Sequence, residues 1–281
     1  MFRWICRMFL TLFLLCLACV GLLAYAYWVE PNMLVVRSVE VESDQVTQPC
    51  KIVFFTDTHF GQYYDISHAR KITDQINALE PDIVVFGGDL FDNYARDRET
   101  LDLSSLSAAF AEIEAKAGKF AVWGNHDYGG GAARVYEDMM EASGFEVLDD
   151  ESRLLSDYGI RVIGYDDLLM GQTDDSLYML KSQAFNVIVA HEPVIAQKIE
   201  SSSQNLVLTG HTHGGQVTVP VLTDRLLPAG SGEFRKGFYD AQEIGTDVDL
   251  QMYTSSGIGM TRYPFRFLNA PEIVEINVHA A

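Results

Sequence analysis

The chain has 281 residues, 48% of them hydrophobic and 21% charged, a balance that suits a globular protein with a sizeable core. Its 20 basic and 39 acidic residues give a formal net charge of -19. This charge disfavours non-specific binding to nucleic acid or to anionic lipid head groups, so we expect no nucleic-acid partner. A phosphorylated substrate is still compatible with it, because bound divalent cations can reverse the local field.

The N-terminus carries an uncharged apolar segment, residues 8–29, between Arg7 and Glu30. It is longer than the ~20 residues that a helix needs to cross a bilayer. Aromatic residues flank it, as interfacial anchors do in membrane proteins: Trp4 at one end, and Tyr25, Tyr27 and Trp28 at the other. We therefore predict a single-pass membrane anchor.

Arg3 and Arg7 precede the apolar segment, whereas acidic residues dominate the stretch that follows it. The positive-inside rule then predicts a cytoplasmic N-terminus and an extracytoplasmic domain. A cleaved signal peptide is the competing interpretation, since Ala24-Tyr25-Ala26 matches a small-residue cleavage site. The apolar segment exceeds the roughly 7–15 residues of a typical signal core, which favours an uncleaved anchor.

We divide the chain into an anchor or signal sequence (1–29), a linker with a first strand (30–50) and one large domain (51–281). In the first half of that domain, the apolar runs 52–55, 83–86 and 120–123 predict buried strands. The helical spacing over 65–79 and 100–115 places helices between them. Strands that alternate with helices predict an α/β fold with a sheet buried on both faces, and ligands bind beyond the carboxyl ends of such strands.

The second half is richer in strand signals, and we expect an irregular loop with a short helix over 165–182. The expected strands are 160–164, 185–190, 205–209, 216–219, 248–254 and 272–278. Only Cys50 lies beyond the first twenty residues among the four cysteines, so no disulfide framework is expected in the domain.

Polar clusters follow the apolar runs at the points where the strands end. Five of the seven histidines occupy this position, in company with Gly, Asp or Asn: His59, His126, His191, His211 and His213. Imidazole and carboxylate groups suit Mn, Fe and Zn, and the scarcity of cysteine argues against a thiolate zinc site. A pair of closely spaced ions also needs a bridging anionic ligand, which a carboxylate supplies. The pattern predicts a two-metal hydrolase.

The ordered blocks resemble the calcineurin-like metallophosphoesterase superfamily. The blocks are Asp57-Thr58-His59, Gly88-Asp89 with Asp92, Gly124-Asn125-His126-Asp127, His191, and Gly210-His211-Thr212-His213. Gly214-Gly215-Gln216 and the tail from Gly257 to Glu272 resemble a branch of membrane-anchored or exported bacterial enzymes. The resemblance covers about residues 45–281 and implies a four-layer α/β/β/α sandwich, so 51–281 would be the metallophosphoesterase domain.

The resemblance also implies roles for individual residues. Asp57, His59 and His213 would hold the first metal, Asp89 would bridge the two metals, and Asn125, His191 and His211 would complete the second site. His126 would contact the phosphoryl group or protonate the leaving oxygen, with Asp127 orienting it and Asp92 supporting a ligand from behind. The cofactors would be two divalent ions, Mn, Fe or Zn, with Mn favoured.

The expected function is hydrolysis of a phosphomonoester, phosphodiester or pyrophosphate bond in a membrane-associated, possibly lipid-linked substrate. Arg262 and Arg266 form a basic cluster for which ordinary packing of a late loop is the favoured interpretation, and contact with a substrate phosphate or with lipid head groups is the functional alternative. One alternative is UDP-2,3-diacylglucosamine pyrophosphohydrolase, whose cytoplasm-facing substrate conflicts with the topology predicted above. A non-catalytic metal-binding scaffold is the other.

Overall fold

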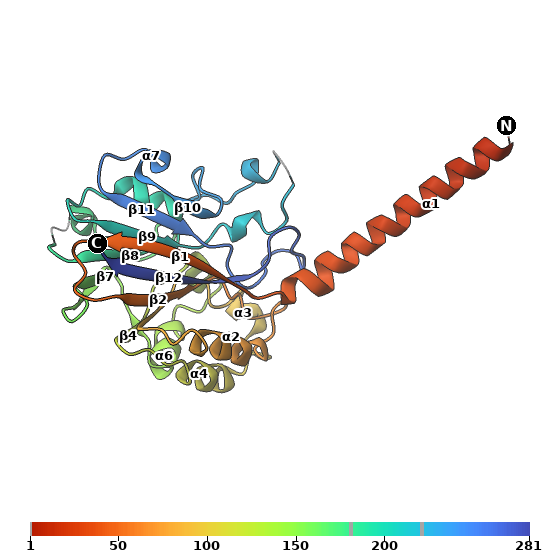
Figure 1. Ribbon diagram of the computed structural model, residues 1–281. Coiled ribbons are helices and arrows are strands. Elements are labelled where there is room, and N and C mark those ends of the chain that lie inside the picture. The colour runs from red at the N-terminus through yellow and green to blue at the C-terminus, as the bar shows by residue number, and fades with distance from the viewer. Residues whose placement is uncertain (1, 180–181, 220–221) are drawn as a thin grey trace.

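The computed structural model describes residues 2–179, 182–219 and 222–281, and it contains two packed six-stranded sheets (Figure 1). The first sheet has the strand order β1-β12-β2-β3-β4-β5. Its strands are β1 (Val35–Ser43), β12 (Glu272–Ala280), β2 (Cys50–Phe55), β3 (Ile83–Phe86), β4 (Gly118–Ala121) and β5 (Glu146–Val147). Strands β2 to β5 run parallel, while β12 is antiparallel to β2.

The second sheet has the order β10-β11-β9-β8-β7-β6. Its strands are β10 (Gly237–Tyr239), β11 (Leu250–Thr254), β9 (Asn205–Thr209), β8 (Phe185–Val189), β7 (Ile160–Gly164) and β6 (Glu151–Leu155). The four central strands are parallel and the two edge strands are antiparallel. The buried strands β8 and β9 are apolar on both faces, as parallel strands covered on both sides must be.

Three apolar cores separate the four layers. The central core lies between the sheets, with Phe54 and Val85 from one sheet and Val187 and Leu208 from the other. The outer face of the first sheet is covered by α2 (His68–Asn77), α4 (Leu103–Ala111) and α6 (Tyr136–Ala142). The outer face of the second sheet is covered by short elements, the 3-10 helix Pro193–Lys198 and α7 (Ala241–Ile244). The predicted α/β/β/α sandwich is confirmed.

Most predicted elements are present, with shorter bounds at the helix ends. The helix expected over 100–115 begins at Leu103, because the Asp102 side chain accepts a hydrogen bond from the Ser105 amide and caps it. The expected 216–219 strand is wrong. Gly215 and Gln216 have φ values of 80° and 54°, which break the extended path and leave a single bridge between Val217 and Phe267.

Several short elements were not predicted. They are the strands β5, β6 and β10 and the helices α3 (Tyr94–Asp97), α5 (Asn125–Gly129), α6 and α7. The irregular region expected over 165–182 contains a short 3-10 helix, Asp175–Met179, and residues 180–181 of that expectation lie outside the described residues.

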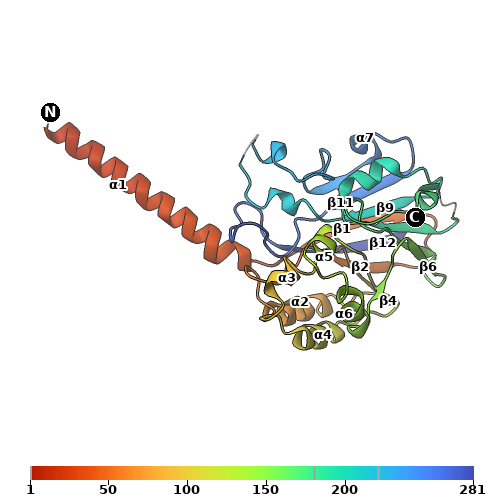
Figure 2. The same ribbon diagram turned by 180° about the vertical axis from the view of Figure 1, so that it is seen from behind.

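The N-terminal helix α1 (Phe2–Ala24) projects away from the domain (Figures 1 and 2). The helical segment Phe2–Asn32 has a mean hydropathy of 2.5 over its most apolar window, and none of that window is buried by the protein. One N-terminal helix is therefore long and apolar enough to span a membrane.

Candidate dinuclear metal centre

The predicted metal ligands converge where the carboxyl ends of the two sheets meet. Asp57 and His59 follow β2, and Asp89 follows β3. His191 follows β8, and His211 and His213 follow β9. Since the central strands are parallel within each sheet, their carboxyl ends share one edge, and packing the sheets brings both edges together.

The backbone is unusual at five of these positions. Non-glycine residues with positive φ include Asp57 (53°), His59 (44°), Asp89 (59°), His211 (68°) and His213 (50°). Such conformations are costly for residues with a Cβ and concentrate at functional sites. Two neighbouring glycines allow the close approach that results. A Cβ on Gly124 would lie 2.4 Å from Asp89 Oδ1, and one on Gly210 would lie 2.1 Å from Asp57 Oδ2.

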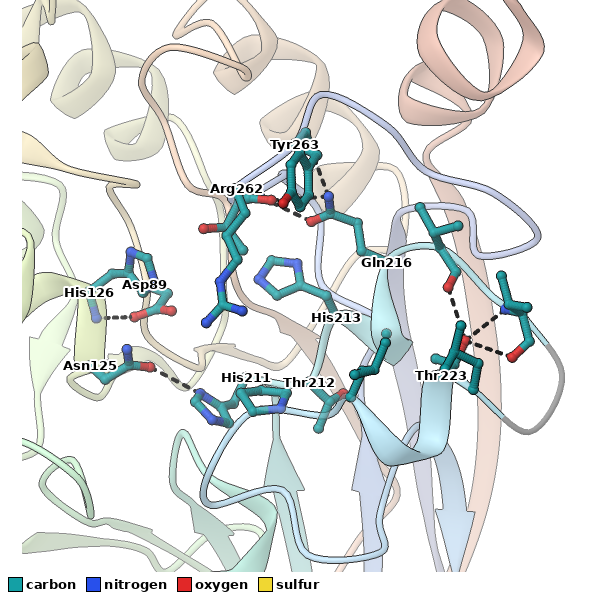
Figure 3. A pocket seen from close by; sticks show the side chains of 17 residues that line it. Asp89, Asn125, His126, His211, Thr212, His213, Gln216, Thr223, Arg262 and Tyr263 are labelled. Carbon is teal, nitrogen blue, oxygen red and sulfur yellow. Dashed lines mark hydrogen bonds between the residues drawn. The ribbon is translucent and has the colours of Figure 1, made fainter. Parts of the chain in front are cut away.

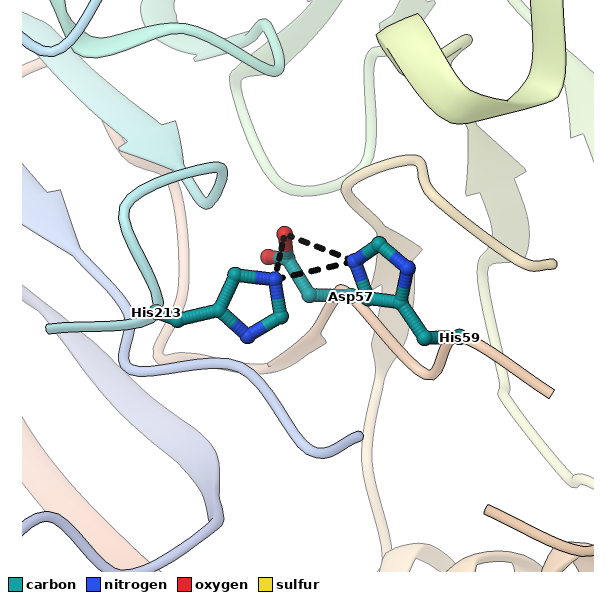
Figure 4. Close-up of side chains that lie close together, drawn as sticks. All are labelled: Asp57, His59 and His213. Atoms are coloured by element: carbon teal, nitrogen blue, oxygen red, sulfur yellow. Dashed lines mark hydrogen bonds and ion pairs between the residues drawn. The ribbon is translucent and has the colours of Figure 1, made fainter. Parts of the chain in front are cut away.

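The first group consists of Asp57, His59 and His213 (Figure 4). Asp57 Oδ1 lies 3.8 Å from His59 Nε2 and 3.4 Å from His213 Nε2. The two Nε2 atoms are 2.9 Å apart. All three residues are buried. One cation can contact all three side chains from this position.

The second group of predicted ligands lies beside the first group, and a carboxylate lies close to histidines of both groups. Asp89 Oδ2 is 3.3 Å from His59 Nε2 and 3.1 Å from His191 Nε2, so this oxygen lies between a histidine of each group. Asn125 Oδ1 is 3.0 Å from His211 Nδ1 at the rim of the same cluster. The structure thus brings all seven predicted ligands together, and the Asp89 carboxylate lies between the two groups.

Backbone carbonyls fix which imidazole nitrogen faces the cluster. His191 Nδ1 donates to the carbonyl of Gly87 at 2.8 Å, which leaves Nε2 to point at Asp89. His211 Nε2 donates to the carbonyl of Ala229 at 2.6 Å, which leaves Nδ1 to point at Asn125. A nitrogen whose partner nitrogen carries the proton presents a lone pair, the form that binds metal.

The donor set fits divalent metal ions. His59 Nδ1 and His191 Nε2 are buried with no hydrogen-bond partner of good geometry among the described residues. Two imidazole Nε2 atoms in contact at 2.9 Å repel unless a proton or a cation lies between them. Buried polar atoms are normally satisfied, and a bound cation would satisfy these atoms. Imidazole and carboxylate donors without thiolate suit Mn, Fe or Zn.

Burial lowers the pKa values of His59 and His191, but the neighbouring carboxylates outweigh it and hold both pKa values well above the usual value. Burial raises the pKa of Asp89, but the neighbouring His191 and His126 outweigh it and hold that pKa well below the usual value. Burial, together with His191, lowers the pKa of His211 to about 4. Asp89 is therefore ionised and His211 neutral at physiological pH, the forms that bind metal, whereas His59 and His191 would release a proton when a metal binds.

His126 stands beside the ligands. Its Nδ1 donates to the backbone carbonyl of Asp92 at 2.7 Å, so the ring is oriented by Asp92. The expected orienting contact from Asp127 is not among the hydrogen bonds of these residues. The Asp127 carboxylate instead accepts from the amides of Asp89 and Gly124, at 2.9 and 3.0 Å, and fixes the loop that carries the bridging ligand. The Asp92 carboxylate lies 3.6 Å from His59 Nδ1, in the supporting position expected for it.

A pocket of about 430 Å³ opens on this cluster (Figure 3). Asp89, Asn125, His126, His211 and His213 form its polar floor. The pocket also has an apolar wall, which the strand expected over 216–219 does not predict. This wall consists of Val217, Val219, Leu222, Leu226 and Pro228.

The two candidate arginines take different places. Arg262 is exposed, lines the pocket and reaches into it between Asp89 and His213 (Figure 3). Arg266 is fully buried, and its guanidinium donates to the carbonyls of Gly259 and Ser256 at 3.0 Å each. It lies behind His213, 3.4 Å from Nδ1. The placement of Arg266 contradicts direct contact with substrate and makes it a residue that holds the His213 loop.

We expect the two arginine variants to behave differently. Arg262→Ala should raise KM by about tenfold, the effect of one charge-assisted hydrogen bond, without changing Tm. Arg266→Ala should lower the free energy of unfolding by about 3 kcal/mol, because it leaves buried carbonyls unpaired. Thermal melts and steady-state kinetics measure both, with the exposed Arg225→Ala as control. A raised KM with unchanged Tm in Arg266→Ala would contradict this assignment.

Hydrogen bonds join the end of the N-terminal helical segment to the loops of the candidate metal centre. Glu30 is buried, and its carboxylate accepts from the amides of Leu268 and Asn269. Asn269 in turn donates through its side chain to the carbonyl of His213. The carbonyl of Ala26 accepts from the Arg266 amide at 3.0 Å. Sequence reasoning missed Glu30, whose signal was a lone charge at the end of an apolar segment.

Glu30→Ala should therefore loosen the loop that carries His213. Unsatisfied buried amides cost about 1–3 kcal/mol, so Tm should fall, and Mn²⁺ affinity should fall with it. Thermal melts with titrated Mn²⁺ measure both quantities, and Glu42→Ala, an exposed position on β1, is the control. An unchanged Mn²⁺ affinity would show that the anchor contact does not reach the centre.

Fold and site together define a metal-dependent hydrolase built on an α/β/β/α sandwich. Residues 50–215 match the family Calcineurin-like phosphoesterase, which is more than half of the chain. The chain belongs to this family, whose members use a dinuclear divalent metal site, and it is a metallophosphoesterase.

Known proteins with metallophosphoesterase names are similar in sequence to this chain over most of its length. It is 32% identical over 260 residues to the uncharacterized metallophosphoesterase YkuE of Bacillus subtilis (strain 168), covering 89% of this chain and 87% of that protein. It is 26% identical over 240 residues to the phosphodiesterase YaeI of Escherichia coli (strain K12), covering 82% of each. It is 25% identical over 243 residues to a transmembrane protein with metallophosphoesterase domain of Danio rerio, covering 80% of this chain and 52% of that protein.

Proposed function

We propose that this metallophosphoesterase hydrolyses a phosphoester whose alcohol is apolar and membrane-associated. The observation that carries the proposal is the two-sided pocket. Its floor is formed by the predicted metal-ligating side chains, and its apolar wall is formed by Val217, Val219, Leu222, Leu226 and Pro228. A phosphate suits the floor and an alkyl or acyl group suits the wall, because each removes its own kind of surface from water.

The seven converging residues divide into two ligand sets around Asp89. Asp57, His59 and His213 would hold one ion, and Asn125, His191 and His211 would hold the other, with Asp89 shared. Ions held there lower the pKa of a water and offset negative charge on the phosphoryl oxygens. We favour Mn²⁺.

The chain's own side chains carry the remaining steps. Arg262, aimed into the pocket and without an ion pair among the described residues, binds a non-bridging phosphoryl oxygen. His126, fixed through Nδ1 by the Asp92 carbonyl, presents Nε2 to the leaving oxygen and donates a proton to it.

Two comparisons test the proposal with the full-length protein in detergent micelles and Mn²⁺. Methyl and octyl p-nitrophenyl phosphodiesters share a leaving group and differ only in the apolar chain. The value of kcat/KM should rise with chain length by up to about fourfold per methylene, the effect of about 0.8 kcal/mol per buried CH₂. EDTA should abolish both rates and Mn²⁺ restore them. Equal rates for the two esters would refute the apolar specificity, and no rate for either would favour a non-catalytic scaffold.

The apolar wall also suits a lipid-linked pyrophosphate, so UDP-2,3-diacylglucosamine pyrophosphohydrolase is the second candidate. That activity needs the domain on the cytoplasmic face, whereas Arg3 and Arg7 favour the outer face. Protease treatment of intact spheroplasts separates the two. Loss of the domain supports the outer-face enzyme, and protection supports the pyrophosphohydrolase.

A further inference from the structure

An apolar surface lies around the mouth of the metal pocket, next to the membrane anchor. Its exposed residues, named the apolar rim here, are Val217, Val219, Leu222, Leu226, Tyr263 and Leu268. Leu222 is 50% exposed, Leu226 68%, Tyr263 66% and Leu268 61%. Single exposed apolar residues need no explanation, but a gathered set on one face of a water-soluble domain marks an interaction site.

The rim is one continuous surface, although its residues come from two loops. The Thr218 amide donates to the Phe267 carbonyl at 2.8 Å, and Val217 and Phe267 form a bridge. The Gln216 side chain donates to the carbonyl of Tyr263, also at 2.8 Å. These bonds hold the loops of residues 216–219 and 261–268 together, so the rim keeps its shape.

The same surface continues into the anchor. The Tyr27 ring packs edge-on against Phe265, with centroids 5.6 Å apart, and Trp28 is 67% exposed next to it. A groove of about 450 Å³ between α1 and this loop is lined by Val20, Leu23, Ala24, Tyr27, Trp28 and Phe265. Aromatic residues at the end of a membrane helix sit at the level of the lipid head groups.

The arrangement in space places the rim on the bilayer side of the domain. In Figures 1 and 2 the light-blue segment around Thr223–Arg225 lies on the side from which α1 projects. The anchor fixes the domain at the membrane, and the contacts of Tyr27, Ala26 and Glu30 with the loop of residues 265–269 fix how it faces. When α1 spans a bilayer, the surface that adjoins its end on that side would face the lipid.

We propose that the apolar rim inserts into the head-group and acyl boundary of the bilayer, so that the metal pocket opens directly onto the membrane. Five of the six rim residues also line the pocket, so the rim lies between the lipid and the metal centre. An amphipathic substrate then enters from the bilayer without passing through water. The insertion is independent of turnover, whereas this substrate route rests on the proposed function.

Lipid-depth fluorescence tests the insertion without any substrate. Leu222→Cys and Leu268→Cys are introduced singly into the full-length chain carrying Cys6→Ser, Cys16→Ser and Cys19→Ser, and labelled with an NBD maleimide. Cys50 stays, because burial raises its pKa to about 12 and keeps the thiol unreactive. The matched control is Leu154→Cys, 49% exposed on β6, which lies at the far end of the domain from α1 (Figure 2).

The proteins are reconstituted in vesicles of phosphatidylethanolamine and phosphatidylglycerol with 5-doxyl lipid. NBD at 222 and 268 should emit at shorter wavelength and be quenched by the doxyl group, and NBD at 154 should show neither effect. Quenching no stronger at 222 and 268 than at 154 would overturn the insertion. A blue shift without quenching would also overturn it, because it would show that a protein surface, such as a second copy, covers the rim.

Turnover tests the route into the pocket. Leu268 lies on the rim but outside the pocket lining, and its φ of 54° suits aspartate better than leucine. Leu268→Asp should slow hydrolysis of a vesicle-embedded alkyl ester about tenfold more than it slows hydrolysis of the soluble methyl ester. Leu154→Asp should change neither rate. Equal effects of Leu268→Asp on both esters would refute the bilayer route, while absence of turnover in the wild type would refute the proposed function and leave the insertion standing.

Discussion

Asp89→Ala is expected to abolish metal-dependent turnover and to remove the stabilisation that Mn²⁺ gives the folded protein. The Asp89 carboxylate contacts both groups of ligands, with Oδ2 3.3 Å from His59 Nε2 and 3.1 Å from His191 Nε2. Without this anion, two cations would face each other with little to offset their repulsion. Metal ions contribute several kcal/mol to transition-state stabilisation, so kcat/KM should fall by ~10³-fold or more.

Metal content and thermal melts separate this effect from simple unfolding. In the wild type, Mn²⁺ at 100 times its Kd should stabilise the fold by about 2.7 kcal/mol, and the Tm should rise with Mn²⁺ concentration. Asp89→Ala should show less bound metal and a smaller shift. The control is Asp82→Ala, at the opposite end of β3, where the carboxylate pairs with Lys116 at 2.9 Å. That variant should be less stable yet keep its metals. Full metal occupancy in Asp89→Ala would exclude the bridging role.

The gathering of the polar residues could be predicted from the sequence because parallel strands impose a simple rule, whereas their separate roles as ligands were implied by the family resemblance. Each apolar run ends at the same edge of its sheet, so residues such as Asp57, Asp89 and His191 had to meet if the runs were strands. The burial of β2, β3, β8 and β9 made these runs unambiguous. The four layers followed from the same alternation of apolar runs and helical segments.

What could not be predicted depends on long-range hydrogen bonds. Arg262 and Arg266 are four residues apart in one loop, yet one reaches into the pocket while the other is buried behind His213. Asp127 is adjacent to His126 in sequence, but its carboxylate is directed to the amide of Asp89. The periodicity of apolar residues does not predict the directions of these side chains, because positive φ angles and turns set them.

The apolar wall of the pocket was missed for a related reason. Alternating Val217 and Val219 resemble a short strand, but the left-handed backbone at Gln216 turns the chain away before a ladder can form. The same valines then face the pocket instead of a neighbouring strand. The same local sequence is compatible with a strand and with a pocket wall. The conformation of the preceding backbone determines which of the two structures forms.

His126→Ala is expected to keep both metals and lose most activity. His126 lines the pocket, and its amide donates to Asp89 Oδ1 at 2.7 Å, a contact that alanine retains. The lost group is the ring, whose Nδ1 is fixed by the Asp92 carbonyl while Nε2 is free to act on substrate. Loss of a general acid typically costs 10²–10⁴-fold, so kcat should fall by about that factor for alkyl esters.

Leaving-group dependence shows which of two roles the ring has. If His126 protonates the leaving oxygen, the loss should be large for alkyl leaving groups and small for p-nitrophenolate, which departs without a proton. His68→Ala is the control, since that ring also meets a backbone carbonyl through Nδ1 but lies on α2, outside the pocket. Equal losses for both leaving groups would assign His126 to the phosphoryl oxygens, and full turnover in the variant would remove it from catalysis. Because Asn125 and His126 come from the same turn after β4, the result also tells how far that turn serves metal binding and how far it serves proton transfer.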